Sequence, residues 1–275
     1  MNIKKYLFGV MAIALCGLMT SCDTDNIGAK YNPNFQNVSF EVEKASTITT
    51  SETTITVPVR VTRSLTSGSY TANYTLTSEN EGVFSSPDNG AVTFAEGSGV
   101  AYINLVASNL EKGKDYSCKI TLSEKDIATA DTITKTQVTE TIISIHADYN
   151  WVAAGTCKFI DFTFADDEEN GEAVDGVKIE NGEGSNVYRI IDPYRTLYGS
   201  SVAAGNITFT QNADGSIQLT NGRHCTVGSY TIYSDNVNYG AYCYVENVGN
   251  HYAVNHLLLA GTSLYTGYFE FIWNK

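Results

Sequence analysis

Two tyrosine-rich segments in the C-terminal half, residues 192–198 and 230–244, carry the side chains with which proteins bind sugars. Aromatic faces stack on the C–H groups of a sugar ring, and amides and carboxylates bind its hydroxyl groups. The first segment follows an expected strand directly, where loops commonly carry binding residues. We therefore expect ligand binding by Tyr194, Tyr198, Asp235, Tyr239 and Tyr242. The alternative is that these tyrosines are core residues, since tyrosine is common in strands.

The residues that could support catalysis do not form a recognisable motif. The chain has no Gly-x-Ser-x-Gly elbow, no Walker loop and no dinucleotide fingerprint, so the sequence predicts no catalytic residue and no cofactor. Cys225 follows His224 directly, but adjacent strand residues point to opposite faces, which disfavours a thiolate pair. A glycosidase would need two paired carboxylates, and the spacing of the available ones singles out no pair. These carboxylates are Asp161, Asp192, Asp235, Glu246 and Glu270.

The possible metal ligands are also scattered, and we expect no metal site. His251 and His256 are five residues apart, which places them on opposite faces of a strand. Acidic residues of the N-terminal half that could bind calcium are interrupted by other residues, so the sequence leaves a calcium site open without specifying one. They are Glu79, Glu81, Asp88, Glu124 and Asp126.

The N-terminal segment is typical of an exported lipoprotein. Basic residues precede a short apolar stretch that is too short to span a bilayer, and Thr20 and Ser21 precede Cys22. We expect residues 1–21 to be a signal peptide, Cys22 to carry the lipid and residues 22–36 to form a tether. The acidic tether start, Asp23-Thr24-Asp25, resembles a signal for export to the outer leaflet in glycan-foraging Gram-negative bacteria. The expected location is therefore the outer membrane, facing the cell surface.

The charge of the chain excludes some partners. The net charge is −13, and it becomes −15 once the signal segment with its two lysines is removed. Such a chain repels nucleic acid and anionic membrane surfaces. Membrane attachment would therefore depend on the lipid.

Four cysteines remain after the signal segment and Cys22 are set aside. Cys118 lies in the first half, and Cys157, Cys225 and Cys243 lie in the second. They are either buried free thiols or include one disulfide among the last three, and the sequence does not choose between these alternatives.

Alternation of apolar and polar residues with period two recurs after residue 37, which predicts an all-β protein. Pro58 interrupts one strand and indicates an edge or a bulge. Six of the 18 tyrosines precede residue 147 and twelve follow it. From this change we expect two antiparallel β-sandwich domains: an immunoglobulin-like one at 37–146 and an aromatic-rich sandwich or barrel-like domain at 147–275.

The first domain resembles the Calx-beta family. The similarity is carried by Gly90 to Ser98 (GAVTFAEGS), by the strand Ala101 to Leu105 and by Lys114 to Ser123 (KDYSCKITLS). The resemblance implies an immunoglobulin-like sandwich that acts as a structural or adhesive spacer.

The second domain looks like the C-terminal domain of lipoproteins from glycan-foraging bacteria. The similar residues are Trp151 to Gly155 (WVAAG), Tyr188 to Tyr194 (YRIIDPY) and the hairpin at Asn212 to Gly215 (NADG). That resemblance implies a surface location and no defined chemistry. We therefore expect a non-catalytic surface lipoprotein that captures polysaccharide or oligosaccharide; the alternative is an adhesive or assembly component that binds a surface protein.

Overall fold

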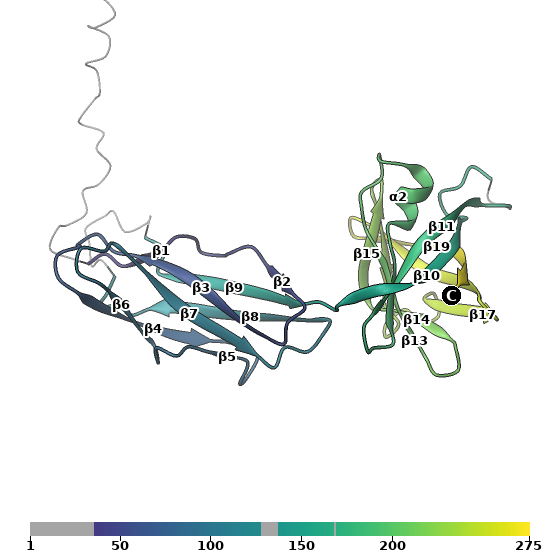
Figure 1. Ribbon diagram of the computed structural model, residues 1–275. Coiled ribbons are helices and arrows are strands. Elements are labelled where there is room, and N and C mark those ends of the chain that lie inside the picture. Colours follow the sequence, from purple (N-terminus) through teal and green to yellow (C-terminus); the bar gives the residue numbers. More distant parts are fainter. Residues whose placement is uncertain (1–35, 128–136, 168) are drawn as a thin grey trace, which may run out of the picture. The chain divides into compact units, whose positions relative to one another are not determined.

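The computed structural model describes residues 36–127, 137–167 and 169–275 (Figure 1). The expected signal peptide and Cys22, the expected lipidation site, lie outside these residues, as does nearly all of the expected tether. The chain divides into two compact units, Met1–Asp148 and Tyr149–Lys275, and each is described by itself. The all-β prediction is confirmed, since strands make up nearly all of the regular structure in the described part.

The first unit is built from two facing sets of strands. One is a four-stranded sheet with the order β1-β3-β7-β5, and the other is a five-stranded sheet with the order β2-β9-β8-β4-β6. Pairing is antiparallel except between β2 and β9. The strands are β1 (Ser39–Phe40), β2 (Ile48–Thr50), β3 (Thr54–Thr62), β4 (Tyr70–Thr77), β5 (Phe84–Ser85), β6 (Ala91–Phe94), β7 (Val100–Ser108), β8 (Lys114–Leu122) and β9 (Glu140–Ala147).

The core of this unit follows from the alternation in its strands. In β7, Ile103 and Leu105 are fully buried while Tyr102 between its buried neighbours is 52% exposed. Burying each such aliphatic side chain contributes about 1.5–3 kcal/mol. Pro58 pairs in register with Asn104 of β7, but β1 covers only the last two residues of β3. The other edge of β3 is therefore open at the proline, where no N–H is available to a partner strand.

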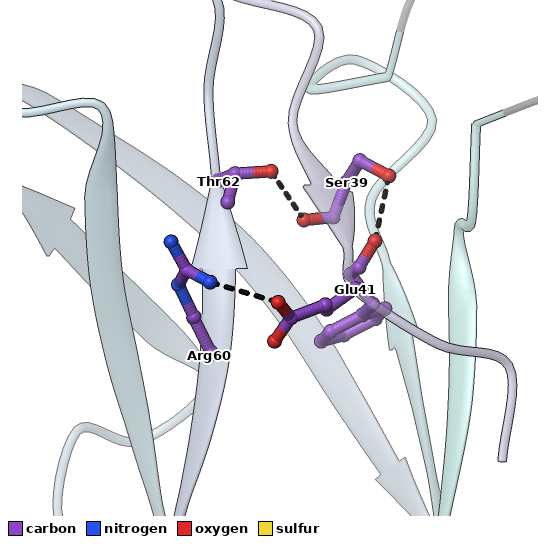
Figure 2. A network of polar contacts seen from close by, with 5 residues as sticks. Ser39, Glu41, Arg60 and Thr62 are labelled. Atoms are coloured by element: carbon purple, nitrogen blue, oxygen red, sulfur yellow. Dashed lines mark hydrogen bonds and ion pairs between the residues drawn. The ribbon is translucent and has the colours of Figure 1, made fainter. Parts of the chain in front are cut away.

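Side chains join the short strand β1 to β3 at the edge of the first sheet. Figure 2 shows the Arg60 guanidinium paired with the Glu41 carboxylate at 2.8 Å, and the Thr62 hydroxyl donating to the Ser39 carbonyl at 3.2 Å. Both charged groups are largely exposed, so their ion pair contributes less than about 1 kcal/mol. Two backbone register positions with β3, these side-chain contacts and an antiparallel bridge from Phe40 to Val138 hold β1 in place.

A buried arginine closes one end of the sandwich. Arg63 is 5% exposed, and its guanidinium donates to the carbonyl oxygens of Ser98, Gly68 and Ala95 at 2.8–2.9 Å. It also lies 5.2 Å from the ring centroid of Phe94. A planar guanidinium can bind several loop carbonyls at once, so one side chain fixes two loops.

The acidic residues considered for calcium include one that has a structural role. Asp126 is 2% exposed and accepts hydrogen bonds from the Tyr70 hydroxyl and from the Asn73 backbone N–H, the latter at 2.8 Å. Burial and the hydrogen bond to Asp126 raise the pKa of Tyr70 to about 12. Asp126 therefore ties the 123–126 turn to β4.

The second unit is one continuous antiparallel sheet of ten strands. Its order is β14-β13-β12-β11-β10-β19-β18-β16-β15, and β17 pairs with β18 beside β16. The strands are β10 (Trp151–Asp161), β11 (Glu172–Gly182), β12 (Val187–Ile190), β13 (Ile207–Gln211), β14 (Ile217–Leu219), β15 (Gly222–Val227), β16 (Tyr230–Ser234), β17 (Tyr244–Val248), β18 (His251–Ala260) and β19 (Ser263–Asn274). A short helix, α2 (Pro193–Tyr198), follows β12 (Figure 1).

The sheet curls until strands from its two ends meet. The Thr208 backbone N–H of β13 donates to Nδ1 of His224 in β15 at 3.3 Å, and the Ser234 hydroxyl of β16 donates to the Thr220 carbonyl directly after β14. A single aromatic core lies inside, including Phe209 and Trp273. Of the two forms left open for this domain, the structure is closer to the barrel-like one.

A glycine allows two neighbouring strands of this sheet to approach closely. Gly155 in β10 has φ +117°, and a Cβ built there would lie 2.3 Å from the Asn274 carbonyl oxygen of β19. The register of β10 against β11 also shifts between Ala153 and Gly155. A larger residue would push β19 away from β10.

The four cysteines in the described part of the chain are free and buried. The buried-thiol alternative therefore describes this structure. Burial raises the pKa of Cys118 to about 11 and the pKa values of Cys157 and Cys225 to about 12.

Candidate functional site

The structure separates the five expected ligand-binding residues into an interior pair and a surface group. Tyr194 is 1% exposed and Tyr198 is half-buried, and both lie in α2. Tyr239 is 39% exposed and Tyr242 is 54% exposed, and both lie in the loop after β16, which also contains Asp235. The two groups therefore have different roles.

The interior pair anchors α2 to the barrel. The chain enters the helix through Asp192, whose φ of 45° is left-handed, and Pro193 occupies its first turn. The Tyr198 hydroxyl donates to the buried Asp161 carboxylate at 2.7 Å, and the Tyr194 hydroxyl donates to it at 3.3 Å. Burial, with the nearby Asp161 charge, raises the pKa of Tyr194 well above its usual value. Tyr194 is thus a core residue and cannot form part of an exposed binding face.

The surface loop is shaped by Asp235. Its carboxylate accepts hydrogen bonds from the Asn238 side-chain amide at 2.8 Å and from the Asn238 and Val237 backbone N–H groups at 2.9 and 3.2 Å. These bonds, the Asn238 side chain first, lower the pKa of Asp235. The Tyr239 N–H donates to the Asp235 carbonyl at 2.9 Å. Asp235 is therefore committed to a turn that presents the tyrosines.

The loop tyrosines line a surface cavity of about 480 Å³ together with residues of the β18–β19 hairpin. Leu257 and Thr266, which pair across the two strands, form part of its wall. Tyr265 is 53% exposed and adds a third tyrosine. The lining residues are Tyr239, Tyr242, Leu257, Leu264, Tyr265 and Thr266. This cavity is the candidate site.

Sequence reasoning did not select Tyr265 as a binding residue. The sequence does contain an indication that a large apolar side chain is exposed here. Leu264 and Tyr265 are large consecutive residues shortly after the turn glycine Gly261, and strict alternation would place one of them in solvent. Leu264 is in fact 37% exposed and Tyr265 is 53% exposed.

A series of aromatic ring contacts joins the cavity to the buried helix. The Tyr265 and Tyr230 ring centroids are 6.1 Å apart, those of Tyr230 and Phe164 are 5.9 Å apart, and those of Phe164 and Tyr194 are 5.8 Å apart. Aromatic pairs at these separations add about 0.5–1.5 kcal/mol each beyond their burial. Register pairs Tyr265 with Leu258, on the opposite face of the strands from Leu257 and Thr266, so these rings pack behind the strands that form the cavity wall.

The buried thiol next to a histidine is not arranged for nucleophilic catalysis. Burial raises the pKa of Cys225 to about 12 and lowers the pKa of His224 to about 4. An activated thiolate paired with an imidazolium requires both shifts in the opposite direction. His224 instead bonds the Ser234 hydroxyl at 2.9 Å and the Thr208 N–H, which joins the ends of the sheet.

The two histidines of β18 point to opposite faces, as the alternation predicts. His256 is fully buried, and its ring lies 5.2 Å from that of Phe269. His251 faces outward and pairs with Glu270 at 2.7 Å. Within residues 36–127, 137–167 and 169–275, no group of three or more acidic, histidine or cysteine side chains is placed to hold a metal ion.

The described residues contain no helix long and apolar enough to cross a membrane. In comparisons with known proteins, no family model and no curated protein matches the chain.

Proposed function

We propose that this protein is a non-catalytic surface lipoprotein that captures glycan, with the first unit as a spacer. The observation that carries the proposal is the open cavity lined by Tyr239, Tyr242 and Tyr265. Exposed aromatic rings around a hollow suit a ligand that offers C–H faces and hydroxyl groups. The lipoprotein features around Cys22 support a location where extracellular glycan would be met.

The expected affinity is modest. A few stacked rings without a deep enclosure correspond to a Kd on the order of 0.1–1 mM. Such binding retains a polymer with many repeats well, because each chain offers many equivalent sites to a crowded surface. A capture role requires no more than this.

The test uses residues 23–275, which include every described residue, in affinity gels that contain polysaccharide. The double variant Tyr239→Ala/Tyr242→Ala should lose retardation by the polymer that retards the wild type. The corresponding double Tyr→Phe variant keeps the rings and should keep the retardation. Tyr102→Ala removes an equally exposed tyrosine of the first unit, at 52% exposure, and should migrate as the wild type does.

The folding control and the refuting result are both direct. Trp151 and Trp273 both belong to the second unit, so unchanged tryptophan emission shows that the unit with the double substitution is folded. Unchanged retardation of a folded alanine variant would remove the cavity as the glycan site.

Exposed aliphatic residues of the second unit favour protein binding as the second candidate function. Val237 is 81% exposed in the loop that carries Tyr239, and Val248 is 85% exposed at the end of β17. Apolar side chains in this position suit an adhesive or assembly contact. If the protein forms a dimer or polymer in light-scattering measurements, Val237→Asp and Val248→Asp should dissociate it. A monomer that binds polysaccharide would reject this candidate.

A further inference from the structure

We propose that the cavity continues into an aromatic strip on the outer face of β17, β18 and β19, and that this surface binds an uncharged linear polysaccharide along several sugar units. The inference rests on the proposed function and specifies the class of glycan. It also adds residues outside the cavity, Tyr244 and Tyr268, to the binding surface.

Backbone register places these residues in one row. Tyr244 pairs with Asn255, and Asn255 pairs with Tyr268. Side chains of directly opposed residues lie on the same face of a sheet. Their neighbours in sequence, such as Val254 and Phe269, are fully buried on the other face. The row therefore faces outward, and Tyr244 is 45% exposed within it.

The row is longer than one sugar ring. Neighbouring strands are about 4.8 Å apart, so Tyr244 and Tyr268, separated by β18, are about 10 Å apart at the backbone. The row extends beyond β19 because the Phe162 ring centroid lies 5.2 Å from that of Tyr268. The spacing of Tyr244 and Tyr268 suits two rings of one extended glycan chain better than two edges of a single sugar.

The row also adjoins the cavity. Leu257 and Thr266 of the cavity wall form the next outward-facing pair along the same two strands, two residues from Asn255 and Tyr268. Two residues of strand correspond to about 7 Å. One glycan chain could therefore contact the cavity tyrosines and Tyr244 at the same time.

Polar groups that can bind hydroxyls flank the aromatic rings. The next outward row holds Glu246 and Glu270, which share Ala253 as their register partner. The Glu270 carboxylate accepts a hydrogen bond from the Tyr268 hydroxyl and pairs with His251 at 2.7 Å. Carboxylate and amide groups beside stacked rings are suited to hydroxyl-rich ligands.

The charge of the surface selects against anionic polymers. The carboxylates of Glu246 and Glu270 share this face with Lys158, His251 and Arg223, which the register places on outward rows. These basic side chains stand on separate strands and do not form a cationic cluster. The whole second unit carries 14 acidic and six basic side chains, a net charge of −8. A sulfated or uronate-rich chain would meet repulsion without a compensating cationic site. The expected ligand is therefore uncharged.

The experiment measures retention of residues 23–275 by two sets of polymers. The uncharged set is soluble starch, dextran, laminarin, galactomannan and xyloglucan; the charged set is anionic and consists of polygalacturonate, chondroitin sulfate and alginate. Retention by at least one uncharged polymer and by none of the charged ones is expected. Oligosaccharides of two to eight units from the retained polymer are then titrated by calorimetry. Affinity should rise at least tenfold between the shortest and the longest.

The variant Tyr244→Ala separates the strip from the cavity. It should weaken binding of the eight-unit oligosaccharide about tenfold while leaving binding of the two-unit one unchanged, which a merely structural role would not produce. Tyr102→Ala serves as the matched control and should leave both affinities unchanged.

Each outcome bears on one proposal or on both. Three results would each overturn the strip: affinity that does not depend on oligosaccharide length, an unaffected Tyr244→Ala variant, or selective retention by a charged polymer. In each case the cavity proposal stands if Tyr239→Ala/Tyr242→Ala abolishes binding. Binding that survives the double cavity variant removes the cavity as the glycan site and, with it, a strip that continues from the cavity. Failure of every polymer to retain the folded protein overturns both.

Discussion

Protonation of His256 in the unfolded chain, which the buried ring of the folded chain resists, should destabilise the second unit as the pH falls from 7 to 5. The ring is fully buried, and neither ring nitrogen has a hydrogen-bond partner. Burial first, and the nearby His224 second, lower its pKa from 6.5 to about 3. The folded protein therefore holds His256 neutral, whereas the unfolded chain takes up a proton below pH 6.5.

The sign and size of the effect follow from linkage. Because the pKa of His256 is lower in the folded chain than in the unfolded one, the stability that depends on its neutral ring is fully present above pH 6.5. This stability is lost progressively as the pH falls towards 3. Each pH unit in that window lowers the unfolding free energy by about 1.4 kcal/mol per histidine. From pH 7 to pH 5 the loss for His256 is about 2 kcal/mol. His224, with its pKa lowered to about 4, adds a loss of similar size.

The assay is urea unfolding of residues 23–275 at both pH values, followed by tryptophan emission. Both tryptophans lie in the second unit, so the signal reports that unit alone. His256→Leu removes the titrating ring and should reduce the pH-dependent loss of unfolding free energy by about 2 kcal/mol. Leu258→Val alters the core on the same strand without removing a titrating group and should keep the full loss. An equal loss in the wild type and in His256→Leu would refute the reasoning.

Three further changes test the roles assigned to buried residues. Tyr194→Ala should lower the unfolding free energy by about 3–5 kcal/mol, because it removes a buried aromatic ring. Tyr194→Phe should lower it by about 1 kcal/mol, because Asp161 keeps its other hydrogen-bond donors. Urea unfolding measures both losses, and equal losses would contradict the core role. Cys157 and Cys225 should react with a thiol reagent at pH 8 only after denaturation, because burial and raised pKa values suppress their thiolates. Rapid labelling of these two cysteines in the native protein would contradict this expectation. Arg63→Ala should cost about 3 kcal/mol by leaving loop carbonyls unpaired. That loss should appear in the thermal transition of the first unit by circular dichroism and leave tryptophan emission unchanged.

The sequence by itself determined the type of fold, because period-two alternation has one physical solution. A strand such as β7, with apolar residues at every second position, can bury them only when it forms part of a sheet with one covered face. Pro58 was also interpretable locally, since a missing N–H excludes pairing on one side. The opposite orientations of His251 and His256 followed from their odd spacing along a strand, because successive side chains alternate between its two faces.

Tertiary structure decided which tyrosines are available to a ligand. Tyr194 and Tyr239 occur in similar sequence surroundings, each near an aspartate and a second tyrosine. A left-handed residue at Asp192 turns Tyr194 into the core, whereas the Asp235 turn leaves Tyr239 at the surface. Residue type does not distinguish these outcomes, because tyrosine is stable in either environment when its hydroxyl has a partner.

The composition of the cavity and the strip also depended on long-range register. Tyr242 and Thr266 line one cavity only because the β18–β19 hairpin lies beside the loop after β16. Tyr244 lies in one row with Tyr268 only because both of their strands pair with β18. Register between strands is set by how the core face of each strand packs against the others. The local sequence specifies which face of a strand is polar, but the neighbours that a residue meets across the sheet are fixed only by the packing of the whole unit.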